Sequence, residues 1–152
     1  MGKFRFALEP VLEQRRRIEE EKQQVLAQRS NELNRAQADL DSFHATYKEH
    51  TVALRDRHQE FASEELRLHY AHLEYLDRAI TTQHAIVAQR KSAAERARLE
   101  LVEAAKERQA IEKLKERKHA EFAANLARVE QNDLDDMNAR RFGRVQVSGG
   151  YA

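Results

Sequence analysis

Histidines are the side chains in this 152-residue sequence with the clearest capacity for chemistry. The chain has seven of them: His44, His50, His58, His69, His72, His84 and His119. His69 and His72 lie three residues apart and Glu65 lies four residues before His69, so a helix would place them on one face, a spacing that could hold a metal. The His-Glu-x-x-His pattern is absent and no further ligand is indicated. We therefore predict no metal site and interpret the histidines as polar residues of helices.

The other residues that enzymes use for catalysis form no recognisable pattern. The chain has no cysteine, which excludes a thiolate nucleophile, a disulfide framework and a cysteine-based metal site. Its few glycines, Gly2, Gly143, Gly149 and Gly150, form no phosphate-binding loop. Carboxylates alternate with Arg and Lys, as on solvated helix faces. The sequence predicts a protein that is not an enzyme, with no catalytic residue and no cofactor.

The residues that break helices lie at the two ends of the chain. Pro10 is the only proline, and residues 11–142 contain neither proline nor glycine. The composition is 35% charged, 41% apolar and 7% aromatic, with no tryptophan. A fold containing strands would need turn residues about every dozen positions. We therefore predict an all-α protein, with Pro10 at the first helical position.

A sevenfold repeat of large apolar residues organises the first half of the chain. Its members are Leu26, Leu33, Leu40, Tyr47, Leu54, Phe61 and Leu68. Such a repeat directs one stripe of a helix against another helix. The residues three positions further on are poorer, namely Arg29, Ala36, Phe43, His50 and Arg57. This pattern favours a slender coiled coil over a packed helical bundle.

A second ridge begins five residues after the first ends. It comprises Leu73, Ile80, Val87, Ala94 and Leu101, with Leu76, Gln83, Arg90, Ala97, Ala104 and Ile111 three residues further on. A continuous coiled coil absorbs insertions of three or four residues but not a jump of five. The sequence therefore predicts a break in the helix, with Ser63 as a candidate N-cap.

These patterns predict an elongated antiparallel two-helix coiled-coil hairpin. The expected parts are a single domain over 1–144, with arms at 10–61 and 73–140 and a turn near 62–72, followed by a flexible tail at 145–152. The alternative is a straight helix that pairs with a second copy of itself. The hairpin is favoured because two matched arms can fold back without a partner.

Charge and hydropathy restrict the environment. The chain has 27 basic and 26 acidic side chains, and their interspersion argues against nucleic acid as a partner. The apolar runs are too short to span a membrane, and the N-terminus lacks the apolar region of a secretory signal. A cytoplasmic location is the default expectation.

Three features indicate binding to other proteins. Aromatic residues gather near the break, namely Phe43, Tyr47, Phe61, Tyr70 and Tyr75. They either fill the seam or stay partly exposed for a partner; the seam is favoured for Phe61, and both readings stay open for Phe43 and Tyr47. The apolar residues at 4, 6 and 8 either pack on the second arm, which is favoured, or dock into a partner. The run at 113–118 is a basic patch, most simply a solvated face.

The opening of the chain carries the pattern Phe-x-Phe-x-Leu-x-x-Val-Leu-x-x-Arg, formed by Phe4, Phe6, Leu8, Val11, Leu12 and Arg15. This pattern resembles the start of FliJ-family proteins of the bacterial flagellum. The stretch from Ala62 to Ile80 is similar to the tip region of that family, and the resemblance extends to about Arg144.

The resemblance implies a soluble component of the flagellar type III export apparatus. Members of the family are antiparallel two-helix coiled coils, similar to the central shaft subunit of rotary ATP synthases. The implied partners are the export ATPase FliI, at the centre of its hexameric ring, the cytoplasmic domain of the export gate protein FlhA, and flagellar export chaperones. The protein would couple ATP hydrolysis to export without catalysing a reaction. It would lie in the cytoplasm, peripheral to the inner membrane, without membrane insertion.

The resemblance also implies two sets of binding residues. The gate-protein set is Leu40, Phe43, Tyr47, His72, Leu76, Ala79 and Gln83, with His84 as an alternative to Gln83; His72 stands where the family has an aromatic residue. By analogy with the rotary shaft, the ATPase-ring set is Val11, Leu12, Ile18, Phe122 and Val129, together with the basic patch.

Three other functions are considered. The first is the equivalent stalk protein of a virulence type III secretion system, although the N-terminal motif favours the flagellar version. The second is an unrelated homodimeric coiled-coil scaffold, which light scattering would distinguish. Binding to nucleic acid or to a membrane surface is a distant third, because the charges are balanced and interspersed.

Overall fold

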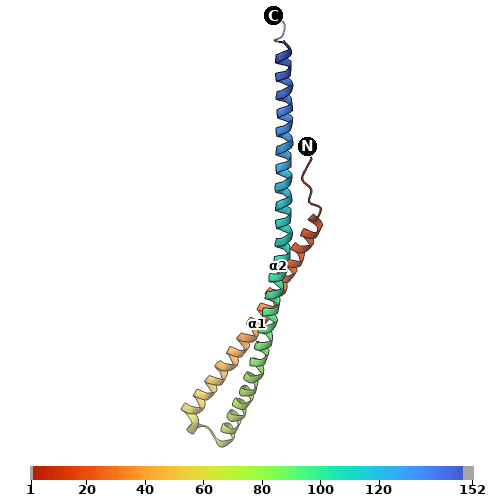
Figure 1. Cartoon of the computed structure of the whole chain (residues 1–152). Helices are drawn as coiled ribbons and strands as arrows, with labels where there is room; N and C mark the ends of the chain where they lie inside the picture. The colour runs from red at the N-terminus through yellow and green to blue at the C-terminus, as the bar shows by residue number, and fades with distance from the viewer. Residues whose placement is uncertain (1, 149–152) are drawn as a thin grey trace. The chain divides into compact units, whose positions relative to one another are not determined.

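The computed structural model describes residues 2–148 and is entirely helical in its regular structure. Helix α1 spans Glu9–Arg57, the short 3₁₀ helix η1 spans His58–Glu60, and helix α2 spans Ser63–Ser148. No strand occurs within the described part of the chain. The prediction of an all-α antiparallel two-helix hairpin is confirmed (Figure 1).

Helix α1 begins one residue earlier than predicted. The carbonyl of Leu8 accepts a hydrogen bond from the N–H of Leu12 at 2.9 Å, which makes Leu8 the capping position and Glu9 the first helical residue. Pro10 therefore stands second in the helix. It remains within the first turn, where an N–H has no intrahelical partner, so proline causes no loss there.

The connection between the helices lies at residues 58–62, and residues 63–72, which were expected to form the turn, are helical. The carbonyl of Ala62 accepts from Leu66 N–H at 3.0 Å, and the N–H of Ala62 donates to Glu65 Oε2 at 3.3 Å. Ala62 is thus the cap, Ser63 is the first helical residue, and Glu65 supplies the side-chain half of a capping box. The first residues of α2 lie mostly in solvent and so carry few seam residues. The apolar pattern therefore placed the connection too late in the chain. Leu68, for example, is 72% exposed.

The chain divides into two compact units. The hairpin unit comprises residues 17–105, and the terminal unit comprises the described residues of 1–16 and 106–152. In the hairpin unit, α1 and α2 run in opposite directions and are joined by the connection at the bottom of Figure 1.

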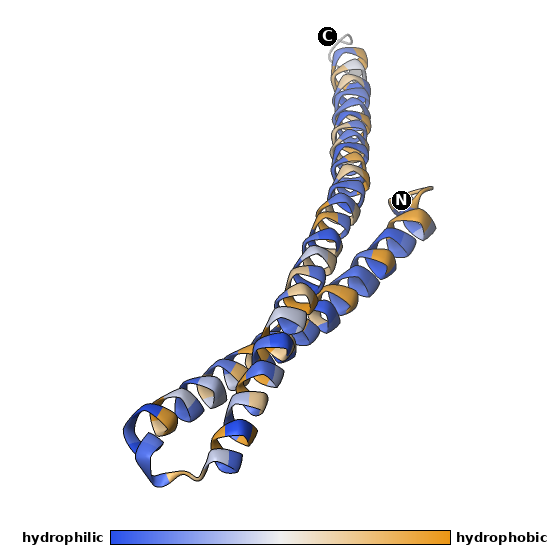
Figure 2. Ribbon diagram, turned by 90° about the horizontal axis from the view of Figure 1, so that it is seen from below, coloured by the Kyte–Doolittle hydropathy of each residue, from blue (hydrophilic) through white to orange (hydrophobic). Residues whose placement is uncertain are grey.

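The seam of the hairpin unit combines the predicted ridges with the residues three positions after them, and the most buried residues of α2 come from the second of these sets. Its buried apolar side chains are Ala36, Leu40, Leu54, Leu76, Ala97 and Ala104. Other ridge residues, such as Leu33, Tyr47 and Ile80, are only half-buried because a pair of helices offers no third layer to cover them. The ribbons are correspondingly hydrophilic over most of their length, with short apolar stretches between (Figure 2).

Gln83 is the one buried polar side chain among the described residues, and it joins the two helices of the hairpin unit. Its Nε2 donates a hydrogen bond to the backbone carbonyl of Ala36 at 2.9 Å. Ala36 allows this contact because its methyl group leaves the backbone of α1 within reach. A slip of one turn would leave the amide of Gln83 without this acceptor, so the contact favours a single alignment.

In the terminal unit, the N-terminal segment and the first turns of α1 pack along α2. Leu12 is fully buried. The ring of Phe4 lies 5.7 Å from that of Phe122 and meets His119 edge-on at 5.0 Å, so the segment packs on α2 as favoured from the sequence. An ion pair joins Glu9 to Lys115 at 2.7 Å.

Helix α2 continues through residues 145–148, which were expected to belong to a flexible tail. A single glycine, Gly143, was not enough to end the helix, because the cost of one glycine in a helix is only about 1 kcal/mol relative to alanine. Residues 149–152 of the expected tail lie outside the described residues.

The Gln83 contact yields a stability prediction. Gln83→Met removes the hydrogen-bond donor but keeps the side-chain volume. The Ala36 carbonyl can still accept the hydrogen bond of its own helix. The free energy of unfolding should therefore fall by less than about 1 kcal/mol. Gln83→Glu should cost at least about 2 kcal/mol at pH 7, because a buried carboxylate would face a carbonyl oxygen. Urea unfolding followed by circular dichroism measures both.

Lowering the pH should reduce the loss of stability caused by Gln83→Glu. Burial raises the pKa of the introduced carboxyl in the folded state, so its penalty is absent below the unfolded pKa of about 4.3 and grows as the pH rises through that value. When protonated, the carboxyl can donate to the Ala36 carbonyl. Equal stability of Gln83→Glu and the parent chain at pH 7 would contradict the assigned contact.

Candidate functional site

The seven residues predicted to bind a gate protein divide into two groups in the hairpin unit. Leu40, Leu76 and Gln83 are buried between the helices, with exposures of 4%, 3% and 9%. Phe43, Tyr47, His72 and Ala79 are half-buried. The first group packs between the two helices, and only the second has side-chain surface exposed to solvent.

A cluster of histidines lies near the connection, and sequence reasoning had found only part of it. His50 of α1 lies edge-on to His72 at 4.5 Å between ring centres and 6.1 Å from His69. Phe61 and Tyr75 extend the cluster, the first against His69 at 4.6 Å and the second stacked on His72 at 6.2 Å. The antiparallel register brings His50 to this cluster, and spacing within α2 alone could not reveal it.

These histidines do not form a metal centre. Within residues 2–148, no group of three His, Asp or Glu side chains has the geometry to hold a metal ion. The cluster instead forms an aromatic surface of polar rings. A second pair, His44 and His84, joins the two helices at 5.6 Å between ring centres, and both residues are exposed.

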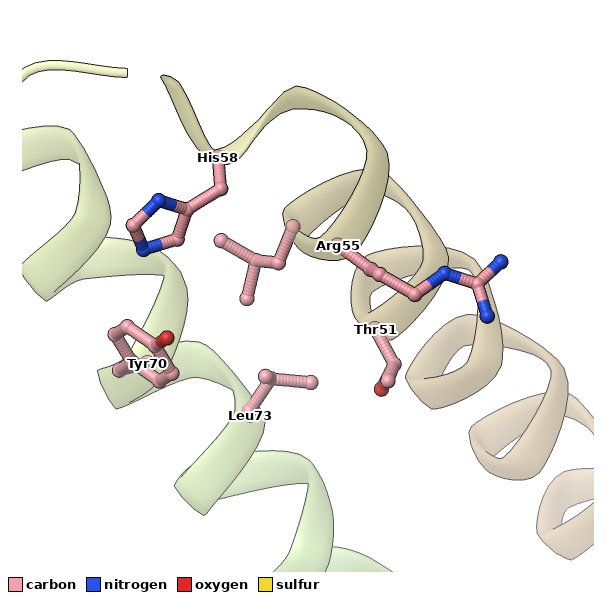
Figure 3. A pocket seen from close by; sticks show the side chains of 6 residues that line it. Thr51, Arg55, His58, Tyr70 and Leu73 are labelled. Atoms are coloured by element: carbon pink, nitrogen blue, oxygen red, sulfur yellow. The ribbon is translucent and has the colours of Figure 1, made fainter. Parts of the chain in front are cut away.

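A hollow of about 340 Å³ lies between the helices close to the connection (Figure 3). Thr51, Arg55 and His58 contribute from the side of α1 and η1, and Tyr70 and Leu73 from α2. Tyr70 is 52% exposed. The aromatics predicted near the break therefore include one, Tyr70, that lines an open hollow.

The charged centre of the hairpin unit is Glu32. Its Oε2 accepts from Arg29 at 3.1 Å within α1 and from Arg90 of α2 at 3.4 Å. The hydrogen bond from Arg29 lowers the pKa of Glu32, and the positive charges of Arg29 and Arg90 act in the same direction, while partial burial opposes them. Both arginines stand three residues after a ridge residue, at positions that face the other helix. The network therefore replaces apolar packing at this level of the seam.

The residues predicted to face an ATPase ring differ in burial and belong to both units. Leu12 is buried within the terminal unit, Val11 and Phe122 are half-buried, and Val129 is exposed. Ile18 is half-buried and belongs to the hairpin unit. Exposure therefore favours Val11, Phe122 and Val129 as contact residues of the terminal unit.

The N-terminal segment forms a groove with α2 in the terminal unit. The groove has a volume of about 530 Å³ and its apolar lining includes Phe4, Phe6, Leu114 and Phe122. The neighbouring basic patch is partly neutralised, because Lys115 pairs with Glu9 at 2.7 Å and Lys118 with Glu121 at 3.2 Å. Two of the four basic side chains of the patch are thus engaged in ion pairs of the chain itself.

The Glu32 network predicts a specific titration. The carboxyl of Glu32 should titrate below the ordinary value of 4.5, so its contribution to stability is present above that pH and is lost as the pH falls through its own lower pKa. Arg29→Gln should raise the pKa of Glu32 more than Arg90→Gln, because the Arg29 hydrogen bond is the largest cause. Carboxyl carbon chemical shifts in the two variants measure this order, and the reverse order would contradict it.

Comparisons with known proteins bear on the whole chain. The family model described as flagellar FliJ protein matches residues 4–146. Comparison with curated proteins gave no match. A solved structure described as that of a proposed YscO homologue from Chlamydia trachomatis is 20% identical, with a TM-score of 0.48, and the alignment covers 96% of this chain and 99% of that one.

The family match includes α1, the connection and all but the last two described residues of α2. It begins at Phe4, the first aromatic residue of the N-terminal motif. The chain belongs to the FliJ family of flagellar proteins.

Proposed function

We propose that this protein is a non-enzymatic stalk of the bacterial flagellar type III protein export apparatus. The observation that carries the proposal is the family match over residues 4–146. The fold agrees with such a role, because a pair of helices has little interior in which a substrate could be enclosed. Its surfaces are suited to contacts with other proteins.

The proposed partners are the export ATPase FliI, the cytoplasmic domain of the gate protein FlhA, and flagellar export chaperones. The stalk would couple ATP hydrolysis by FliI to export through the gate and would escort chaperones. It would act in the cytoplasm, held at the inner membrane through its partners. Among residues 2–148, neither helix has the length and apolar composition of a membrane span.

The gate protein would contact the hairpin unit at Phe43 and Tyr47, with His72 and Ala79 contributing from α2. The two aromatic side chains are half-buried, so part of each remains exposed to a partner. Aromatic residues held in this way lose little conformational freedom on binding and are enriched among residues that dominate binding energies. The buried Leu40, Leu76 and Gln83 would support this surface from beneath.

The ATPase would contact the terminal unit at Val11, Phe122 and Val129. This proposal is supported by the exposure of Val129 and the partial exposure of the other two. Leu12 would contribute indirectly, by holding α1 against α2.

The gate contact can be tested by a double substitution. Phe43→Ala with Tyr47→Ala should weaken binding to the FlhA cytoplasmic domain by at least about tenfold, because two aromatic anchors are removed. Isothermal titration calorimetry measures the affinity, and circular dichroism verifies that the variant remains helical.

The matched control is Leu99→Ala with Val102→Ala. These side chains are exposed on α2 of the same unit, at 55% and 38%, and belong to neither predicted set. The control pair should bind like the parent chain. Unchanged binding by the Phe43 and Tyr47 variant would reject the proposed gate surface.

A further inference from the structure

The last turns of α2 carry a stripe of side chains without partners. From residue 127 onward every described residue of α2 up to 147 is exposed. Val129, Met137 and Val147 are among its large apolar residues, with exposures of 52%, 63% and 75%. A helix of such composition, without packing on one face, gains little stability from tertiary contacts.

One face of this segment has a regular order. Successive spacings of four, three, four, four and three residues connect Val129, Asp133, Asp136, Arg140, Arg144 and Val147. These spacings span five turns at 3.6 residues per turn, so the six residues lie on one stripe of the helix, which we call the C-terminal stripe. The half-buried Phe122 and Leu126 continue the same stripe toward the middle of α2.

The C-terminal stripe is complementary to itself when its direction is reversed. It has an apolar residue at each end, its two acids come first from the N-terminal end, and its two bases come first from the C-terminal end. Two antiparallel copies would place Val129 opposite Val147, Asp133 opposite Arg144, and Asp136 opposite Arg140. Two-fold symmetry makes each of these contacts twice.

The charged members of the stripe are available for such contacts. Asp133, Asp136, Arg140 and Arg144 form no ion pair within the described residues. Beside them, Arg140, Gly143, Arg144 and Val147 line a shallow hollow of about 420 Å³. A Cβ atom at Gly143 would meet nothing within 4 Å, so this glycine leaves open space beside the two arginines.

The charge balance selects a second copy as the occupant. Residues 128–148 contain four acidic and four basic side chains, so the segment has no net charge to attract a membrane or a strongly charged partner. Separation of the acids from the bases along one stripe favours an antiparallel partner with the same order.

We propose that the C-terminal stripe binds the same stripe of a second copy of this chain in an antiparallel, two-fold symmetric contact. This contact goes beyond the proposed export function, and it can be tested without any other protein. It would cover Val129, one of the residues proposed to face the ATPase, so dimer formation and that contact would compete.

Charge reversal tests the proposal with the full chain. Asp133→Lys with Asp136→Lys should weaken self-association at least about tenfold, because lysines would face arginines, and Arg140→Glu with Arg144→Glu should do the same. An equal mixture of the two variants should associate as tightly as the parent chain, since every pair is then opposite in charge. Sedimentation equilibrium measures the average mass of each variant and of the mixture, which is compared with the 17.8 kDa mass of one chain.

Controls come from another face of the same segment. Arg128→Glu and Asp135→Lys change the charge by the same sign and kind but lie off the stripe, so self-association should be unchanged. A parent chain that stays monomeric up to millimolar concentration would overturn the proposal. Failure of the mixed variants to associate would overturn it as well.

Cross-linking tests the direction of pairing, and the natural chain has no cysteine to interfere. A mixture of Val129→Cys and Val147→Cys chains should form a mixed disulfide dimer on oxidation. Val129→Cys alone should not, because two copies of position 129 would lie about 27 Å apart along antiparallel helices. Efficient cross-linking of Val129→Cys alone would indicate parallel pairing and overturn the proposal.

Discussion

The structure depends on one constraint: each apolar stripe has a single neighbouring helix to cover it. Burial is therefore narrow, and small residues such as Ala36, Ala97 and Ala104 share the seam of the hairpin unit with Leu40, Leu54 and Leu76. Polar contacts across the seam add to its alignment, chiefly the Gln83 bond to Ala36 and the Glu32 bridge to Arg90.

The same constraint directs where function can lie. A pair of helices buries few side chains completely, so many side chains of the seam stay partly uncovered. Phe43 and Tyr47 are held in this state, and the rings around His50 and His72 form a second surface near the connection. Membership of the FliJ family gives these surfaces a context in protein export.

In the terminal unit, apolar side chains are buried in a different way. There the N-terminal segment adds Phe4 to the contacts of Phe122, and Leu12 is fully buried. From residue 127 to residue 147 every residue of α2 is exposed. Along the C-terminal stripe of this segment, two acidic residues are followed by two basic residues. The C-terminal stripe of this exposed segment is in contact either with solvent or with another molecule.

The sequence alone determined the helical class, the phases of the two ridges and the family resemblance, because these depend on local spacing and on breakers such as Pro10. Only the tertiary structure decided the cap at Ala62, the meeting of His50 with His69 and His72, and the separation of Leu40, Leu76 and Gln83 from Phe43 and Tyr47. Spacing along one helix predicts which residues share a face. Which of them are covered depends on the partner helix and its register, and those are set by residues far apart in the chain.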